Sequence, residues 1–242
     1  MAEKHRLRLN RAGTIINLTS RQQETALGGA LKVTTAELLD QFGLELTHKK
    51  RWKLTDIVSR LSADFPDIDF YTPSAQASMN PDGGILSITD HDGIEYPILI
   101  SEVKNQGTND LRAAEGKKPQ AKGNAIERLG KNVIGIRAAM LSEGIVPFVC
   151  FGYGVDFDEG SSILDRVATI AMYGSLNKIY VVNAGTQDQF NRGSFFFRGP
   201  EWSEAEMTQI LIEIGTRSIH YYFAKYGESY FAKAAGAENG DA

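Results

Sequence analysis

The chain has 242 residues, of which 42% are hydrophobic and 23% are charged, values typical of a soluble globular protein large enough to bury one sizeable core. The net charge of −4 and the isoelectric point near 5.6 argue against a protein that coats nucleic acid without selectivity. The longest apolar run, Ile145 to Phe151, has seven residues, whereas a transmembrane helix needs roughly 20.

Targeting signals and cysteines set two further limits. The basic stretch from Met1 to Arg11 is followed by no apolar segment with a cleavage site, so we expect a cytoplasmic protein without membrane association. The single cysteine, Cys150, cannot form an intramolecular disulfide, and with four scattered histidines it leaves no Cys/His zinc cluster. We expect Cys150 to be a buried core residue and any metal ion to be held by oxygen ligands.

Strand and helix signals alternate along the chain without internal repeats, which predicts one α/β domain. An Asp-Gly turn between two apolar runs favours a β-hairpin. The expected elements of the first half are helices at residues 35–46 and 52–64, the former capped by Thr34 or Thr35, and a hairpin of strands 84–89 and 96–104.

The second half of the chain continues this alternation. Ser203 and Glu206 have the spacing of a capping box, which predicts a long helix from there to about Tyr226. The other expected elements are helices at 124–142 and 162–173 and strands at 146–151, 178–182 and 194–198. As domains we expect a basic N-terminal arm at 1–21, which includes Arg21 and is either a DNA-embracing arm or a solvated tail, one folded domain at 22–233, and a flexible tail at 234–242.

Three charged residues are expected to meet around the hairpin. Glu102 and Lys104 are two residues apart on one strand and therefore face the same side, and Asp82 precedes the neighbouring strand. Two carboxylates suit Mg²⁺, which keeps several waters and is usually shared with substrate phosphate. The cation polarises a phosphoryl group, and Lys104 can orient or deprotonate the attacking water. The alternative is an exposed ion pair on an amphipathic strand.

A basic stretch follows these residues. Between Lys104 and Arg137 there are eight Lys or Arg and three Asp or Glu, an excess of five positive charges in a chain of net charge −4. A phosphodiester substrate requires such a local excess, although charge alone is equally compatible with a solvated surface.

Three motifs in one order resemble a known family. Pro81-Asp-Gly-Gly84, Glu102-Val-Lys-Asn-Gln-Gly107 and Gly123-Asn-Ala-Ile-Glu-Arg128 resemble the motifs of the EcoRI-type restriction endonucleases, within the PD-(D/E)xK nuclease superfamily. The resemblance covers about residues 80–132, with a weaker echo at 164–166 and 173–174. It implies a restriction-endonuclease-like central mixed β-sheet flanked by helices, and Mg²⁺-dependent double-strand cleavage of DNA that leaves 5′-phosphate ends. The implied catalytic residues are Asp82, Glu102 and Lys104, and the implied metal ligands are Asp82, Glu102 and the carbonyl of Val103.

The third motif also has a reading from its own chemistry. The carboxamide of Asn124 can pair with N6 and N7 of adenine, and Ala125 is small enough to contact a thymine methyl. Gly123 lets the backbone approach base edges. The alternative for Asn124 is an ordinary helix N-cap. We expect Glu127 and Arg128 to form a paired network that positions this segment. The full set of expected DNA-binding residues is Ala121, Lys122, Gly123, Asn124, Ala125, Glu127, Arg128 and Arg166.

Two departures from the family concern the outer base pair of the site. Gln120-Ala-Lys-Gly123 replaces Met-Ala-Ala-Gly, and Ile163 stands where the first of two arginines flanking Leu-Asp belongs, so that only Arg166 remains. We therefore expect a six-base palindrome with central AATT and favour GAATTC, with CAATTG as the alternative.

A palindromic site has two identical half-sites, which predicts a homodimer. A companion DNA adenine methyltransferase acting on the same site is the expected means of host protection. The rival functions are a structure-specific or repair nuclease of the same fold and a catalytically inactive DNA-binding module. The presence of Asp82, Glu102 and Lys104 argues against the inactive module.

Overall fold

Five strands form the central sheet of the structure, a computed structural model that describes residues 15–105, 124–154, 157, 162–181 and 192–235. Three strands at one side, β1, β4 and β5, pair antiparallel, and β5, β6 and β7 pair parallel. The sheet is therefore mixed, as predicted. In spatial order the strands are β1 (Leu46–Lys49), β4 (Ile85–Thr89), β5 (Glu95–Asn105), β6 (Phe148–Tyr153) and β7 (Ser194–Arg198).

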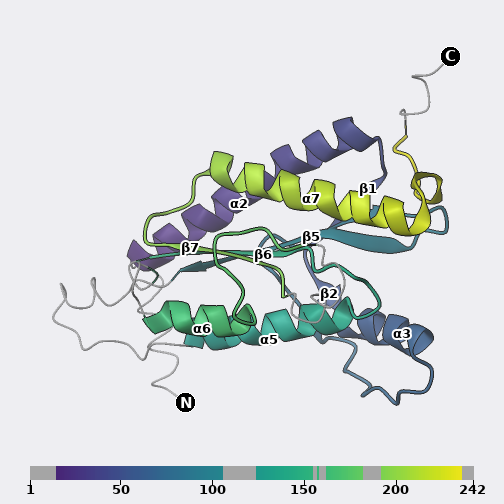
Figure 1. Cartoon of the computed structure of the whole chain (residues 1–242), viewed down its shortest axis with the longest axis horizontal. Helices are drawn as coiled ribbons and strands as arrows, with labels where there is room; N and C mark the ends of the chain where they lie inside the picture. Colours follow the sequence, from purple (N-terminus) through teal and green to yellow (C-terminus); the bar gives the residue numbers. More distant parts are fainter. Residues whose placement is uncertain (1–14, 106–123, 155–156, 158–161, 182–191, 236–242) are drawn as a thin grey trace.

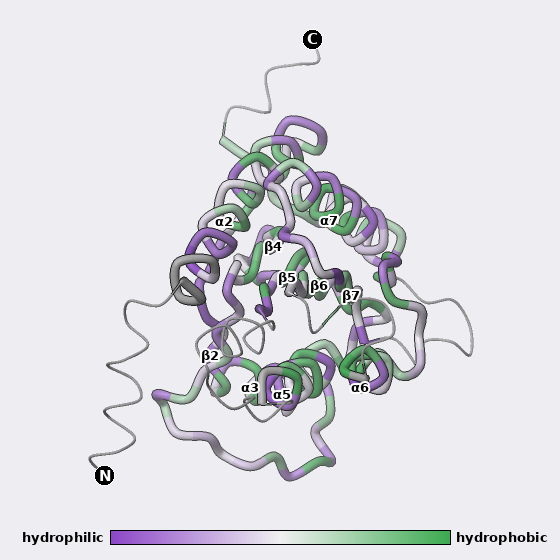
Figure 2. Tube along the Cα trace, turned by 90° about the vertical axis from the view of Figure 1, so that its left-hand side faces the viewer, coloured by the Kyte–Doolittle hydropathy of each residue, from purple (hydrophilic) through white to green (hydrophobic). Residues whose placement is uncertain are grey.

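Helices cover both faces of this sheet (Figure 1). Helices α2 (Ile15–Phe42) and α7 (Glu204–Tyr226) lie on one face, and α5 (Asn124–Ala139) and α6 (Ser162–Ile170) lie on the other. Their apolar residues turn toward the sheet (Figure 2), where one continuous core forms between the layers. This three-layer arrangement confirms the expected restriction-endonuclease-like α/β fold. The remaining elements are β2 (Trp52–Lys53), α3 (Leu54–Asp64), β3 (Ser78–Met79) and a 3₁₀ turn (Glu228–Tyr230).

The expected hairpin is present as β4 and β5, and it leaves part of β5 open. Strand β4 begins at Ile85, which pairs with Ile100, so the described residues of β5 beyond Ile100 have no β4 partner. On its other side, β5 pairs with β6 from Ile100 to Asn105. The edge of β5 that faces the chain before β4 is thus available to other groups at its carboxyl end.

Helix α2 differs most from the sequence-based expectation. The helix predicted at 35–46 is the last part of an element that begins at Ile15 and ends before Gly43, whose φ of 60° stops it. Thr34 is buried within the helix, and Thr35 Oγ1 donates to the carbonyl of Leu31 at 2.8 Å, so neither threonine caps a helix. Helix α2 also runs through the arm boundary placed at residue 21, and residues 1–14 lie outside the described residues.

The strand predicted at 178–182 is wrong for residues 178–181, and residue 182 lies outside the described part. The backbone N–H of Tyr180 donates to Ser194 Oγ at 2.9 Å, so a side chain takes the place of a ladder bond. Val181 accepts one bond from Val146 N at 3.1 Å. The segment therefore follows the sheet without joining it.

At the C-terminal end, the predicted long helix and its capping box are confirmed, because Ser203 Oγ accepts from Glu206 N and the Glu206 carboxylate accepts from Ser203 N. Ala234, the first residue of the expected tail, donates its N–H to Gly43 O at 2.9 Å, and residues 236–242 lie outside the described residues.

Candidate active site

A tight turn places Asp82 against the open edge of β5. The Gly84 N–H donates to the carbonyl of Pro81 at 2.9 Å, and Gly84 has a φ of 73°, which favours glycine. The Gly83 N–H donates to the carbonyl of Ser101 at 2.9 Å. The turn thus bonds to β5 at a place where β4 has not yet begun. These bonds hold Asp82 beside Val103 of β5.

The three predicted catalytic residues come together. Asp82 Oδ2 accepts from the Val103 N–H at 3.1 Å and lies 3.4 Å from Lys104 Nζ. Lys104 also forms an ion pair with Glu102 Oε1 and donates to the carbonyl of Val103 at 3.3 Å. One ammonium is therefore within hydrogen-bonding distance of all three predicted metal ligands, Asp82, Glu102 and the Val103 carbonyl.

Burial differs among these side chains. Glu102 is 3% exposed, Lys104 18% and Asp82 30%, so the site opens on the side of Asp82. Burial opposes the charged form of Lys104, but the carboxylates of Glu102 and then Asp82 outweigh it and raise the pKa of Lys104 above its ordinary value. Without a metal ion, Lys104 is thus positively charged near neutral pH, which favours its orienting role over a role as base.

The site carries one negative charge in excess, because two carboxylates face one ammonium. The donor set of two carboxylates and a backbone carbonyl fits Mg²⁺, which prefers oxygen and keeps waters in its remaining positions. These three oxygens all lie close to Lys104 Nζ, so they are near enough to one another to bind one cation. Among the described residues there is no group of three or more His, Cys, Asp and Glu that could hold a metal ion by side chains alone. An open site shared with substrate oxygens is what the geometry allows.

Cys150 is fully buried in β6, in register with Glu102 across the parallel pair. Burial first, and then the charge of Glu102, raise the pKa of the Cys150 thiol well above its ordinary value. The Cys150 thiol is therefore protonated and buried beside Glu102. This confirms its expected place in the core.

Two residues that support the site were not assigned a role from the sequence. The Asn132 carboxamide on α5 donates to both oxygens of Glu102, at 3.0 and 3.1 Å. His48 Nε2 donates to the carbonyl of Gly83 at 2.8 Å, beside Asp82. The signal for Asn132 was its place on the buried face of a helix, between Leu129 and Ile136. The sequence held no comparable signal for His48, because β1 was not expected.

The expected DNA-binding residues are only partly described. Asn124 and Ala125 open helix α5, and Glu127 and Arg128 are exposed on its first turns. Arg166 is exposed on α6, which packs beside α5, whereas Ile163 is 1% exposed and belongs to the core. Ala121, Lys122 and Gly123 lie outside the described residues. Helix α5, which begins at Asn124, also carries Asn132.

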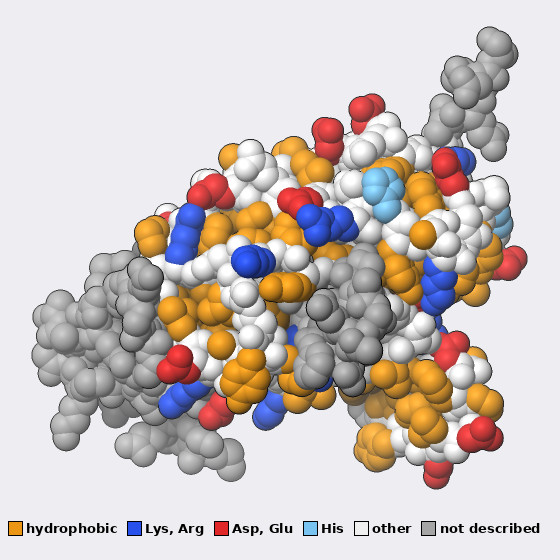
Figure 3. Space-filling view, in the orientation of Figure 1, with side chains coloured by type: hydrophobic (Ala, Val, Ile, Leu, Met, Phe, Trp, Pro, Cys, Tyr) orange, Lys and Arg blue, Asp and Glu red, His pale blue; other side chains and the backbone are white. Residues whose placement is uncertain are grey.

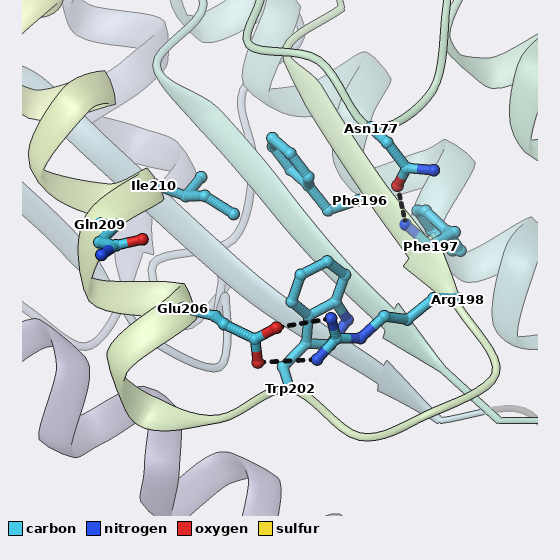
Figure 4. A pocket seen from close by; sticks show the side chains of 8 residues that line it. All are labelled: Asn177, Phe196, Phe197, Arg198, Trp202, Glu206, Gln209 and Ile210. Atoms are coloured by element: carbon cyan, nitrogen blue, oxygen red, sulfur yellow. Dashed lines mark hydrogen bonds and ion pairs between the residues drawn. The ribbon is translucent and has the colours of Figure 1, made fainter.

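A pocket of about 340 Å³ lies elsewhere, between β7 and the start of α7 (Figure 4). Arg198 stacks on Trp202 at 3.8 Å and forms two bonds with the Glu206 carboxylate, at 2.7 and 2.8 Å. These charges satisfy one another, so we assign no ligand to this pocket. Its lining residues are Asn177, Phe196, Phe197, Arg198, Trp202, Glu206, Gln209 and Ile210.

The outer surface agrees with the modest net charge. Acidic and basic side chains are interspersed over the face seen in Figure 3 rather than gathered by sign. Within the described ranges, no helix combines the length and apolar character that crossing a membrane requires.

A mixed sheet with helices on both faces, and Asp, Glu and Lys gathered at the carboxyl end of a central strand, defines the restriction-endonuclease-like class. The family model described as restriction endonuclease EcoRI matches residues 10–162. The chain is 28% identical to the type II restriction enzyme RsrI of Cereibacter sphaeroides, over 67% of this chain and 79% of that protein. It is 27% identical to the type II restriction enzyme EcoRI of Escherichia coli, over 90% and 92% of the two chains.

This chain belongs to the EcoRI family of restriction endonucleases. The matched range includes Asp82, Glu102, Lys104 and the third motif, Gly123-Asn-Ala-Ile-Glu-Arg128, and it ends before Arg166. Membership confirms the resemblance drawn from the three motifs and places the chain among the site-specific nucleases of restriction-modification systems, whose ligand is DNA.

Proposed function

We propose that this protein is a Mg²⁺-dependent type II restriction endonuclease that cuts both strands of a palindromic DNA site. The observation that carries the proposal is the convergence of Asp82, Glu102 and the Val103 carbonyl on one cation, the Lys104 ammonium. A second cation at this place would meet the negative charge that Lys104 leaves uncompensated. The fold and the family support a nuclease, and this geometry supports the metal-dependent chemistry.

Asp82, Glu102 and the Val103 carbonyl would hold the ion. When bound, Mg²⁺ supplies Lewis-acid stabilisation of the phosphoryl oxygens and lowers the pKa of water. Lys104, anchored by Glu102, orients the attacking water and offsets charge that develops on the phosphate. Attack of water at phosphorus with departure of the 3′-oxygen gives a 5′-phosphate and a 3′-hydroxyl, the ends that the family resemblance implies.

For the recognition site, we propose GAATTC, with CAATTG as the alternative. Asn124 pairs with adenine N6 and N7, and Ala125 contacts thymine methyls, with Gly123 allowing close approach. Two subunits then read the four central pairs. Arg166 or Lys122 is left to donate to the outer guanine, because Ile163 is buried and apolar.

Two partners follow from this site. A second copy of the chain matches the two-fold symmetry of a palindrome, so that each subunit cuts one strand. A companion adenine methyltransferase protects the host, because a methyl on adenine N6 disturbs the group that Asn124 contacts. Sedimentation of the protein with and without duplex DNA at micromolar concentration tests the dimer, and a monomer in both conditions would contradict it.

The basic N-terminal stretch is proposed to embrace DNA. Deletion of residues 1–11 is expected to weaken binding equally at all sequences and to reduce its salt dependence. An unchanged affinity and salt slope would leave this stretch as a solvated tail.

Digestion of a plasmid of known sequence, followed by sequencing of the ends, tests the proposal as a whole. We expect fragment ends that fall within GAATTC sites, only with Mg²⁺ and only when the central adenines are unmethylated. Cleavage at branched or damaged DNA without sequence preference would favour the repair nuclease, and binding without cleavage would favour the inactive module.

A further inference from the structure

Asn132 holds the buried carboxylate of the proposed metal site. Glu102 is almost fully buried, and in the described structure its oxygens meet Lys104 on one side and the Asn132 carboxamide on the other. Because one nitrogen donates to both oxygens, at 3.0 and 3.1 Å, it fixes the rotation of the carboxylate about its last side-chain bond. A carboxylate fixed in this way presents its oxygens toward Lys104 in one orientation.

The position of Asn132 in the helix argues for a role beyond packing. Leu129, Val133 and Ile136 around it are buried aliphatic residues of the sheet-facing side of α5. Asparagine is a weaker helix former than alanine, and an apolar residue would continue this face. A polar residue at this point therefore serves the polar group that it meets, which is Glu102.

Helix α5 connects this contact to Gly123-Asn-Ala-Ile-Glu-Arg128, the segment that we propose reads the bases. The helix begins at Asn124, eight residues before Asn132, a separation of roughly 12 Å along the axis. Because both residues belong to one continuous helix, we infer that a displacement of the first turn along the helix axis also displaces Asn132. The two hydrogen bonds then pass that shift to Glu102.

We propose that Asn132 is a positioning residue that orients Glu102 for metal binding and ties the metal site to the helix that begins with the base-reading segment. This inference rests on the proposed function. Partners that orient metal ligands typically contribute about 10- to 100-fold to metal affinity or activity. We expect that range for Asn132.

The test uses Asn132→Ala in the full chain, which keeps α5 helical because alanine favours the helix. Mn²⁺ serves as the probe, and the paramagnetic resonance signal of the free ion reports its binding to the protein without DNA. We expect Mn²⁺ affinity to fall about 10- to 100-fold and the single-turnover cleavage rate with Mg²⁺ to fall over the same range. The affinity for the duplex site without divalent metal should stay within about twofold of wild type, as expected for a residue that does not contact DNA.

The matched control is Gln41→Ala, which removes an exposed carboxamide from α2 in the opposite layer and should change none of these measurements. Wild-type Mn²⁺ affinity and cleavage in Asn132→Ala would overturn the inference and leave the proposed function intact. A loss of metal-free DNA affinity equal to the loss of cleavage would also overturn it, because Asn132 would then be a DNA contact. A wild-type protein that cuts no duplex would overturn the proposed function, whereas a fall in Mn²⁺ affinity would still support the role of Asn132.

Discussion

Two buried glutamates lie near helix α5 and have different surroundings, Glu102 beside the middle of the helix and Glu143 beyond its C-terminal end. Glu102 lies against Asn132 and shares Lys104 with a second carboxylate, Asp82. Glu143 follows the C-terminal end of α5, and its side chain is 1% exposed. Its carboxylate receives Arg60 Nη2 at 2.9 Å and Lys225 Nζ at 2.8 Å, with hydroxyls of Tyr221 and Tyr226 at 3.3 and 3.4 Å.

The balance of charge separates the two places. Around Glu143 two cations face one carboxylate, so no negative charge is left over to attract a further cation. Around Glu102 two carboxylates face one cation, so a negative charge remains at a place that opens to solvent through Asp82. Removing one partner of a buried ion pair is costly, so we expect Glu143 to matter for stability, whereas we expect the excess of carboxylates around Glu102 to favour a divalent cation.

The largest expected effect is on DNA cleavage when residues of the Glu102 site are replaced. Glu102→Ala and Lys104→Ala should each lower the single-turnover rate by about 10³-fold or more, because each removes a group that the proposed mechanism uses at the reacting phosphate. Folding should survive, since Asp82 remains beside Lys104 in the first variant and Asn132 beside Glu102 in the second. Gel-based cleavage and thermal unfolding measure the two quantities. Near wild-type nicking by either variant would contradict the assignment.

The next largest effect is on the free energy of unfolding when Glu143 is replaced. Glu143→Gln removes the buried carboxylate that the partly exposed Arg60 and Lys225 share, and we expect a loss of about 3 kcal/mol in the free energy of unfolding, or roughly 6 to 12 °C in Tm. The control is Glu213→Gln, which breaks an exposed pair with Arg217 and should cost at most about 0.5 kcal/mol. Equal effects of the two variants in urea unfolding would show that burial does not distinguish these glutamates.

A third measurement compares the surroundings of Glu102 and Glu143 by adding Mg²⁺. Mg²⁺ at ten times its dissociation constant should stabilise the wild-type protein by about 1.4 kcal/mol, because it binds only the folded site. The same concentration should stabilise Glu143→Gln equally and should not stabilise Asp82→Asn combined with Glu102→Gln. Stabilisation that survives in the double variant would place the ion elsewhere in the protein.

The sequence predicted the three charged residues of the site, but it did not predict the residues that hydrogen-bond to the site from other elements. Asp82, Glu102 and Lys104 were found because strand alternation and one turn bring them together, and these are short-range rules. His48 and Asn132 act across strand pairs and layers, and their partners depend on the tertiary arrangement. The extent of α2 was missed because Thr34 and Thr35 resemble caps, whereas packing buries the first and the helix backbone bonds the second.

The segment at 178–181 shows the same limit. Its apolar residues fit a strand, but Ser194 Oγ occupies the Tyr180 N–H and no ladder forms. The capping box of Ser203 and Glu206, in contrast, is a three-residue relation that the structure reproduces in full. Local hydrogen bonds were therefore predictable, and bonds between distant segments were not.

The smallest expected effect concerns Glu206, a surface carboxylate that extends the comparison beyond buried groups. Hydrogen bonds from Arg198 and then from Ser203 lower the pKa of Glu206 from 4.5 to about 2. Its contribution to stability is therefore fully present above about pH 4.5 and is lost as the pH falls toward 2. Because the side chain is 44% exposed, solvent screens the pair, and we expect only about 0.5 to 1 kcal/mol.

The difference in free energy of unfolding between wild type and Glu206→Gln should consequently be constant above pH 5 and should vanish between pH 4.5 and 2. Urea unfolding at pH 6, 4 and 3 measures this difference, and 0.5 M salt at pH 6 should reduce it because the pair is exposed. A difference that does not change with pH would mean that the ionised carboxylate is unimportant and that the cap acts through its shape alone. In that case the balance of charge would matter only around the two buried glutamates, Glu102 and Glu143.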